Sequence, residues 1–230
     1  MDRIVETKKQ NRREQIIDHL EDIRHKEYLE LIARAIIEKF APKRVLDVGC
    51  GRGDLVAIFK NWGIEAYGID ALDPSITKSF REDIKDRVFV ADAEALPFKE
   101  ESFDLVIAHH VIEHLHNPEQ FILEARRVLK RGGTVFIVTT ISPLGLTKLW
   151  RILRLQKEPT HISLHARSFW EKTFEKLGFQ FVSDFDELLK KDPPSYSWGK
   201  LLMKLGPIGK VVWLRIVGYI RGSFLFKRID

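Results

Sequence analysis

The middle of this 230-residue chain alternates short, nearly continuous apolar segments with segments of helical periodicity. Apolar runs without polar alternation predict strands that are buried on both faces, and intervening helices predict parallel connections. A parallel sheet needs helices on both faces, so we expect an α/β fold with a doubly wound sheet. The six strands expected first lie at 45–48, 64–70, 87–91, 103–108, 134–140 and 179–182.

Particular residues mark the helix boundaries. Asn117 is a predicted N-cap, with Pro118 at the first helical position and Gln120 three residues after the cap. The same helix is expected to stop at Gly132-Gly133. Further helices are predicted within 14–40, 54–60, 74–85, 167–177 and 196–221, and a last strand within 222–229.

These elements suggest three parts of the chain. Residues 1–41 would form N-terminal helices, 42–185 an α/β core, and 186–230 a C-terminal helical cap with a closing strand. Residues 141–165 break the alternation, and we interpret them as an insertion that caps the substrate. This insertion and the cap are rich in leucine, which favours an apolar or amphiphilic ligand above the sheet.

Composition excludes several classes of protein. A single cysteine, Cys50, rules out a disulfide framework and any multi-cysteine metal centre. The first residues carry charges where a secretory signal would be apolar, and no apolar run is long enough to span a bilayer, so we expect a cytoplasmic protein. The formal charge of +5 is concentrated in 196–230, so a protein that binds nucleic acid over its main face is not favoured. The amphipathic segment 196–221 leaves peripheral membrane contact open.

Three glycines follow the first predicted strand. Gly49, Gly51 and Gly53 are spaced G-x-G-x-G, whereas a dinucleotide site favours G-x-G-x-x-G. Acidic residues lie at or near three strand ends: Asp47 suits a ligand that carries a cation, Asp70 suits ribose hydroxyls, and Asp92 suits an exocyclic adenine amine. Each residue also has an alternative interpretation without a ligand. The glycines can serve only the turn, Asp70 can be a solvated loop residue, and Asp92 can cap a helix.

The segment Val45-Leu46-Asp47-Val48-Gly49-Cys50-Gly51-Arg52-Gly53 resembles the first motif of class I S-adenosylmethionine-dependent methyltransferases. Further matches are Asp70, the run 91–98 with Ser102-Phe103-Asp104, the run 111–115, and the run 129–134, so that the resemblance covers about residues 40–185. The branch it resembles most includes ubiquinone and menaquinone methyltransferases. One departure is Ala71-Leu72-Asp73-Pro74, where the family often has x-Ser-Pro after the acidic residue.

The resemblance implies a Rossmann-like sheet of seven strands, of which one is antiparallel. It also implies that S-adenosylmethionine is the cofactor and S-adenosylhomocysteine the product. The residues then expected to contact the cofactor are Asp47, Gly49, Cys50, Gly51, Gly53, Asp70, Ala71, Leu72, Asp92, Ala93, His109 and His114.

Six of the eight histidines fall in two short segments, 109–116 and 161–165. A base is needed only when the methyl acceptor starts protonated, and histidine is the usual base near neutral pH. The candidates are His110, His161 and His165, although loop histidines that face water are an equal alternative. His109 and His110 are expected to point to opposite sides of a strand end, and no metal site is expected.

The favoured function is methyl transfer to a small, apolar or amphiphilic molecule. The alternatives are a methyltransferase that acts on RNA or protein, a non-catalytic protein that binds S-adenosylmethionine, and a nicotinamide dehydrogenase, which the glycine spacing disfavours. The sequence does not reveal the acceptor or the oligomeric state.

Overall fold

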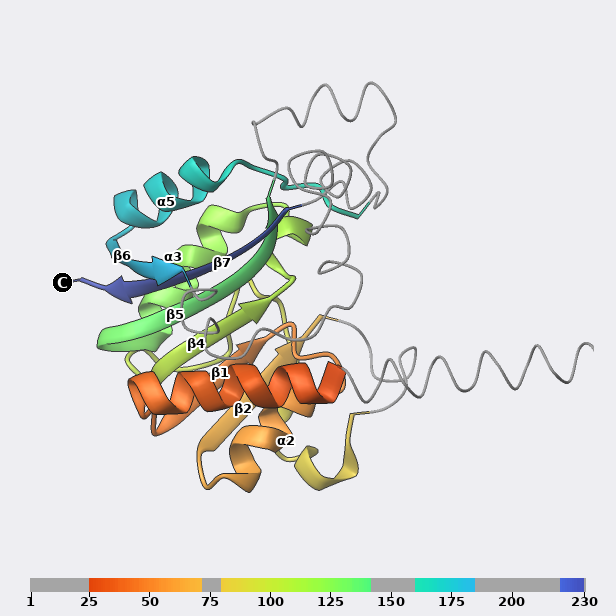
Figure 1. Cartoon of the computed structure of the whole chain (residues 1–230). Coiled ribbons are helices and arrows are strands. Elements are labelled where there is room, and N and C mark those ends of the chain that lie inside the picture. Colours follow the sequence, from red (N-terminus) through yellow and green to blue (C-terminus); the bar gives the residue numbers. More distant parts are fainter. Residues whose placement is uncertain (1–24, 72–79, 142–159, 185–219, 230) are drawn as a thin grey trace, which may run out of the picture. The chain divides into compact units, whose positions relative to one another are not determined.

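The computed structural model describes residues 25–71, 80–141, 160–184 and 220–229 (Figure 1). The chain divides into two compact units, Met1–Ala41 and Pro42–Asp230. In the first unit, residues 25–40 form a helix whose buried residues Leu29, Ile32 and Ile36 recur every three or four positions. That helix agrees with the second half of the helical prediction for 14–40.

The second unit is built on a seven-stranded sheet with the strand order β3-β2-β1-β4-β5-β7-β6. Six strands run parallel, and β7 lies antiparallel between β5 and β6. This confirms the predicted seven-stranded, doubly wound α/β sheet with one antiparallel strand. The strands are β1 Arg44–Val48, β2 Glu65–Asp70, β3 Val88–Val90, β4 Phe103–His109, β5 Leu129–Ile141, β6 Phe179–Asp184 and β7 Ile220–Arg228.

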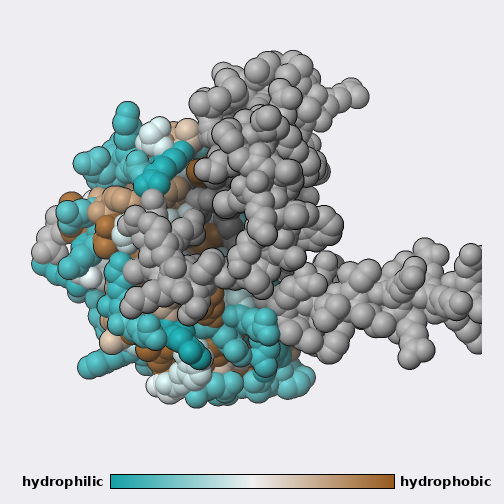
Figure 2. Space-filling view, in the orientation of Figure 1, coloured by the Kyte–Doolittle hydropathy of each residue, from teal (hydrophilic) through white to brown (hydrophobic). Residues whose placement is uncertain are grey.

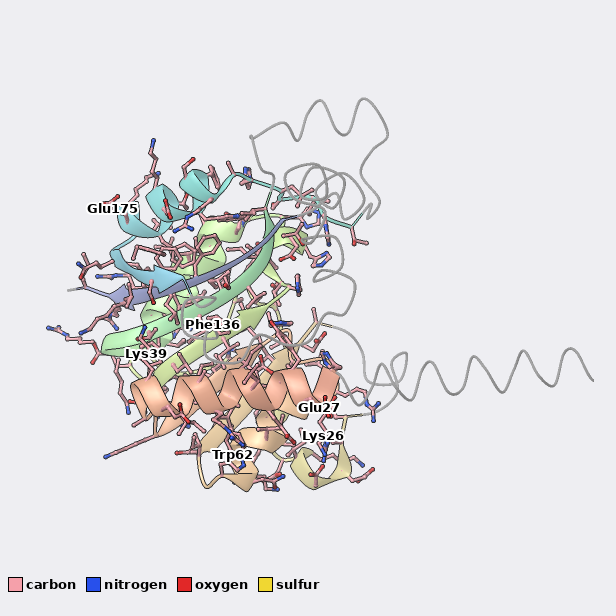
Figure 3. All side chains as sticks on the ribbon, in the orientation of Figure 1. Lys26, Glu27, Lys39, Trp62, Phe136 and Glu175 are labelled. Atoms are coloured by element: carbon pink, nitrogen blue, oxygen red, sulfur yellow. The ribbon has the colours of Figure 1, made fainter. Side chains whose placement is uncertain are left out.

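Helices cover both faces of the sheet. Helices α3 (Pro118–Val128) and α5 (Arg167–Lys176) contribute to one apolar cluster with Ile69 of β2. Helix α2 (Asp54–Asn61) lies against β1 and β2, and its Val56 occupies the space where a Cβ on Gly68 would stand. Successive strand residues point to opposite faces, so α2 covers the face opposite to Ile69. Side chains fill the space between the strands and these helices (Figure 3).

The N-terminus of α3 is formed as the sequence predicts. Asn117 is the N-cap, and its side-chain oxygen accepts a hydrogen bond of 3.2 Å from the backbone N–H of Gln120. Such a cap supplies a partner for one of the backbone donors that a helix start leaves unsatisfied. The orientation of α3, and of the chain that enters it from β4, is therefore specified locally.

The end of α3 corrects the prediction of a helix that continues to Gly132-Gly133. The helix ends at Val128, and Leu129 is already extended and paired with Phe103 of β4. The register shifts between Phe103 and Leu105, and Lys130 forms an ion pair with Asp104. Tertiary pairing of the buried Leu129 therefore outweighs the helical preference of this segment.

Two other boundaries differ from the prediction. Strand β7 begins at Ile220, so residues 220–221 are strand and not the end of a helix. In the segment predicted to be helical at 74–85, the described part contains only a 3-10 turn, η1 (Glu82–Ile84). The second such turn, η2 (Ile112–His114), follows β4.

Several predictions lie outside the described residues. These are the N-terminal part of the predicted helices, Leu72, most of the insertion at 141–165, and the helical cap before β7 with its membrane-facing alternative. The division into 1–41, 42–185 and 186–230 stays a prediction. Among the described residues, no helix combines the length and the apolar character needed to cross a bilayer.

The visible surface of the described part is mainly hydrophilic (Figure 2). The larger exposed apolar side chains occur mostly singly or in pairs, such as Trp62 after α2 and Phe181-Val182 on β6. Scattered residues of this kind are common on globular proteins.

Candidate cofactor site

The strand order creates one position at which a ligand is expected. Strand β1 lies between β2 and β4. After β1 the chain adds β2 and β3 on one side of it, and then crosses over to add β4 and β5 on the other side. Ligands of open α/β sheets bind beyond the carboxyl ends of the strands at this switch point. Gly49 follows β1 there, Asp70 ends β2 and His109 ends β4.

The glycine loop is fastened to the end of β2. The backbone N–H groups of Gly49 and Cys50 both donate to the carbonyl of Ile69, at 2.8 and 2.9 Å. The N–H of Gly51 donates to Oδ2 of Asp70 at 2.8 Å. The loop and the acidic residue that sequence reasoning assigned to one site are therefore in direct contact.

The three glycines of the loop have different surroundings. All three have positive φ angles, 72° at Gly49, 54° at Gly51 and 85° at Gly53. A Cβ at Gly49 would overlap Val111, which follows β4, and a Cβ at Gly53 would overlap Ile84 of η1. A Cβ at Gly51 would meet nothing within 4 Å. Gly49 and Gly53 are thus needed for packing, whereas Gly51 leaves the loop open on the side from which a ligand can approach.

The three aspartates differ in exposure. Asp47 is buried within β1, with 4% of its surface exposed, and its contact with a cationic ligand stays a prediction. Asp70 is half-buried and Asp92 is exposed. Oδ1 of Asp92 accepts a hydrogen bond of 2.8 Å from the N–H of Glu94, within a turn and not at the start of a helix. This bond leaves the other oxygen of Asp92 for a ligand.

Burial and the neighbouring charge of Asp70 raise the pKa of Asp47 from 3.8 to about 8. A carboxylic acid whose pKa is higher in the folded than in the unfolded state favours folding less and less as the pH rises between the two values. Between about pH 4 and pH 8, the ionisation of Asp47 should therefore lower the free energy of unfolding progressively as the pH rises.

Urea denaturation at several pH values, with wild type and Asp47→Asn compared, measures this effect. The variant should be more stable than wild type near pH 8, and the difference should shrink toward pH 4. Asp86→Asn removes an exposed carboxylate and serves as the control. Parallel pH profiles for wild type and Asp47→Asn would contradict the assignment.

The other predicted cofactor contacts lie around this loop. Cys50 is a free, half-buried thiol, and burial followed by the charges of Asp47 and Asp70 raises its pKa. Ala71 is exposed directly after β2, and Ala93 is buried in the turn after β3. These residues follow the ends of β1, β2 and β3, and their contact with a nucleoside stays a prediction.

The structure corrects the expected orientation of two histidines. The rings of His109 and His110 do not point to opposite sides of the sheet, because their centroids are only 4.9 Å apart. The cause is the backbone of His110, which leaves the strand with a φ of 57° and so ends the alternation. Its N–H still donates to the carbonyl of Val138 in β5, at 2.8 Å.

Glu113 is a site residue that sequence reasoning missed. Its side chain is fully buried in η2, and Oε1 accepts from Nδ1 of His110 at 2.8 Å. Thr139 Oγ1 donates to Oε2 at 2.9 Å and the Thr140 N–H donates to Oε1 at 3.2 Å. Burial alone would raise the pKa of Glu113, but these donors, led by His110, lower it to about 2. The sequence signal is the pair Glu113-His114, within the run 111–115 that carries the family resemblance.

The remaining histidines divide between two places. Nδ1 of His114 lies 3.1 Å from the carbonyl of Thr160, and its ring lies 4.8 Å from that of His161. His165 instead stacks on Phe169 of α5 at 3.8 Å, and burial lowers its pKa. His161 thus lies beside His114 in the segment that follows β4, and the ring contacts of His165 are with Phe169 and Trp170 of α5.

One grouping bears on metal binding. Glu113, His114 and His161 can each offer one ligand atom, and these atoms lie within 4.8 Å of one another. The sequence did not reveal this grouping, since His161 is 47 positions from His114. Three hydrogen bonds already engage the carboxylate of Glu113, so we do not assign these residues as metal ligands.

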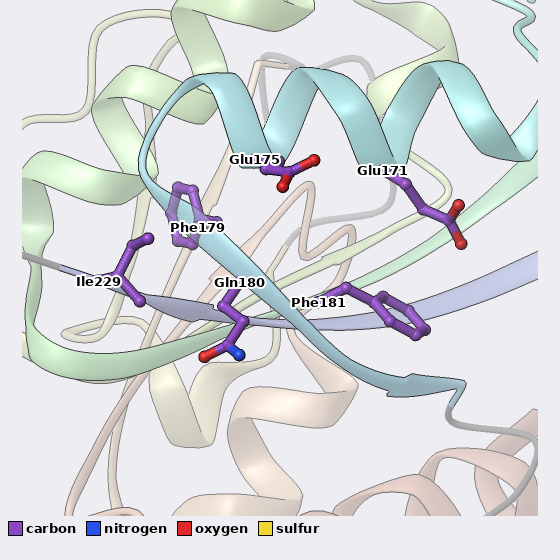
Figure 4. Close-up of a pocket in the computed structure, with 6 residues that line it drawn as sticks. All are labelled: Glu171, Glu175, Phe179, Gln180, Phe181 and Ile229. Carbon is purple, nitrogen blue, oxygen red and sulfur yellow. The ribbon is translucent and has the colours of Figure 1, made fainter.

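A pocket of about 660 Å³ lies between α5 and β6 (Figure 4). It is lined by Phe179 at the start of β6, by Glu171 and Glu175 of α5, and by Ile229 after β7. Because β6 runs in the direction of the parallel strands, this pocket lies at their amino ends. The cofactor site lies at the opposite edge of the sheet, so the pocket is separate from it.

Comparison with known proteins agrees with this site. The family model described as a methyltransferase domain matches residues 20–184. The uncharacterized methyltransferase YcgJ of Bacillus subtilis is 27% identical over 169 residues, which cover 70% of this chain and 65% of that protein. The mitochondrial ubiquinone biosynthesis O-methyltransferase of Rattus norvegicus is 38% identical over 137 residues, or 56% of this chain and 39% of that protein.

Solved structures share the fold. The crystal structure of YcgJ aligns with a TM-score of 0.59 at 21% identity and covers 88% of this chain and 98% of that chain. Magnesium protoporphyrin IX methyltransferase from Synechocystis PCC 6803, with bound S-adenosylhomocysteine, aligns with a TM-score of 0.58 at 16% identity and covers 90% and 84%.

The fold, the glycine loop and the family match together define a class I S-adenosylmethionine-dependent methyltransferase domain, and this chain belongs to that family. S-adenosylmethionine is the cofactor of the class, and the open side of Gly51 beside Asp70 fits a nucleoside of this kind. The sequence matches span between 36% and 65% of the length of the curated relatives.

Proposed function

We propose that the protein is an enzyme that transfers the methyl group of S-adenosylmethionine to a small, apolar or amphiphilic molecule. The observation that supports this proposal is the contact of the Gly51 N–H with Asp70, which brings the glycine loop and an acceptor for ribose hydroxyls together at the switch point. Relatives named as ubiquinone biosynthesis O-methyltransferases and norajmaline N-methyltransferase support a small-molecule acceptor. The single thiol, Cys50, fits a reducing compartment such as the cytoplasm.

Methyl transfer from a sulfonium is a displacement at carbon with a good leaving group. Holding the acceptor in line with the methyl group can supply about 7–11 kcal/mol of the acceleration. In this proposal the glycine loop, Asp70 and His109 hold the cofactor, and His110 and His161 belong to the acceptor side. His110 is the candidate base, because its side chain is 36% exposed and can reach a ligand.

Calorimetry with S-adenosylhomocysteine and with NAD tests the cofactor assignment directly. We expect micromolar binding of S-adenosylhomocysteine and no measurable binding of NAD. Formation of S-adenosylhomocysteine from S-adenosylmethionine, measured over a panel of phenols, amines and unmodified RNA, then distinguishes the acceptor classes. Folded protein that binds neither nucleoside would overturn the proposal, and cofactor binding with turnover only on RNA would overturn the small-molecule acceptor.

A further inference from the structure

Glu113 is an ionised group in an unusual place. Its side chain has no exposed surface, and in the described part of the chain no lysine or arginine pairs with it. A buried carboxylate is costly unless it is paired and hydrogen-bonded. Among the described histidines, His110 is the one that bonds to it, at 2.8 Å, while His114 and His161 each have a ring nitrogen within 4.8 Å of it. The buried carboxylate of Glu113 is therefore placed where it orients the ring of His110.

We propose that Glu113 is the positioning residue of the methyl transfer, since its buried carboxylate holds Nδ1–H of His110 and so presents Nε2 as the base for a hydroxyl acceptor. This inference rests on the proposed function and deepens it, because it names the kind of acceptor. Thr139 Oγ1 and the Thr140 N–H, both from β5, fix the carboxylate in turn. Among the described residues, Nε2 of His110 makes no hydrogen bond.

The backbone of His110 supports the proposal independently. Its φ of 57° is left-handed, a conformation that is unfavourable for a residue with a side chain. The N–H bond to Val138 on one side and the ring bond to Glu113 on the other hold this conformation in place. Strain that persists because its surroundings enforce it is found preferentially at functional sites.

Backbone contacts also hold the turn that carries Glu113. The Ser163 N–H donates to the Glu113 carbonyl at 2.9 Å, and Ser163 Oγ donates to the Leu115 carbonyl at 2.7 Å. The segment 160–164 is thereby tied to η2 beside the base. Among the described residues, the titratable groups near the pair are His109, whose ring lies against that of His110, and His114 and His161, which each have a ring nitrogen within 4.8 Å of a Glu113 oxygen.

The proposed step balances as follows. Nε2 of His110 takes the proton of the acceptor O–H, and an oxygen lone pair forms the new bond to the methyl carbon. The carbon–sulfur bond breaks, and its electron pair stays on sulfur as the neutral thioether of S-adenosylhomocysteine. The imidazolium, held by the Glu113 carboxylate, then loses its proton to water. An acceptor that is already an anion needs no base, which provides the test.

Nitrogen-15 NMR of the histidine rings, in the folded protein with bound S-adenosylhomocysteine at pH 8, tests the geometry without turnover. The neutral ring of His110 should carry its proton on Nδ1, with a bare Nε2. A proton on Nε2 in wild type would overturn the proposal, whatever the acceptor. Absence of S-adenosylhomocysteine binding would instead count against the proposed function.

Kinetics with phenol and 4-nitrophenol at pH 8 test the chemistry, since the second probe is largely ionised there. For Glu113→Gln and for His110→Asn we expect kcat on phenol to fall about 100-fold, in the range of general base catalysis, with KM little changed. On 4-nitrophenol the loss should stay below about threefold. Asparagine suits the left-handed backbone of position 110, and glutamine is isosteric with Glu113, so both variants should fold.

Matched controls distinguish this role from a structural one. Glu124→Gln removes a carboxylate that also accepts a backbone N–H, from Leu96, and an arginine bond, from Arg127. His116→Asn removes an exposed histidine of the same segment. Both should keep the wild-type ratio of rates on the two probes.

Equal losses on both probes for Glu113→Gln would overturn the positioning role. Failure of the protein to methylate any phenol while it binds S-adenosylhomocysteine would overturn the hydroxyl acceptor.

Discussion

Replacing Asp70 by asparagine is expected to weaken S-adenosylhomocysteine binding about 30-fold or more. The asparagine carbonyl can still accept the Gly51 N–H, so the loop should keep its path. The variant loses a charged acceptor for the ribose hydroxyls at the end of β2, and hydrogen bonds to charged groups contribute about 1.5–3 kcal/mol each. Calorimetry on both proteins measures the effect.

Asp86→Asn is the matched control for this experiment. Asp86 is an exposed acid before β3, and its nearest ionic contact, with Arg87, is loose at 3.8 Å. Its replacement should leave the affinity unchanged. Binding by Asp70→Asn within threefold of wild type would show that the acid at the end of β2 does not hold the nucleoside.

The second large effect is expected for Gly51→Ala. Nothing in the protein lies within 4 Å of the added methyl group, so the cost to folding is that of a left-handed alanine, about 1–2 kcal/mol. The methyl group would, however, stand on the open side of the loop where the cofactor approaches. We expect a loss of S-adenosylhomocysteine affinity of about 10- to 100-fold, as for other overpacked sites.

Gly63→Ala provides an internal comparison for Gly51→Ala. Gly63 also has a positive φ, 78°, and also has open space around it, but it follows α2 at the other end of β2. Both variants should lose similar stability in urea denaturation, and only Gly51→Ala should lose binding. Equal affinities for the two variants would remove Gly51 from the cofactor site.

Local sequence patterns predict much of the fold. The buried strands and the glycine loop could be inferred because apolar runs, glycines and strand-end acids carry their structural meaning within a few residues. Asn117 is an example, since cap, proline and glutamine lie within four positions. The contact between Gly51 and Asp70 follows from two neighbouring parallel strands, whose carboxyl ends meet at one edge.

The features that could not be predicted depend on distant partners. The end of α3 at Val128 depends on pairing of Leu129 with Phe103, and the turn of His110 depends on β5. Glu113 acquires its role only because Thr139 and Thr140 arrive from 26 and 27 positions away. A lone acid beside a histidine in the sequence gives no sign of such partners. The burial of Asp47 likewise depends on other strands, since it is set by β2 and β4 on either side.

The position of β7 has a consequence for how the chain matures during translation. Strand β6 pairs with β7 and not with β5, so residues 179–184 have their hydrogen-bonded neighbour about 40 residues later in synthesis. Until residue 228 has left the ribosome, β5 and β6 both lack that neighbour, and Phe174 lacks the ring of Phe226 on which it stacks at 4.1 Å. The nascent chain should therefore complete its core late, and in this interval a chaperone that binds apolar segments would find β5 and β6 accessible.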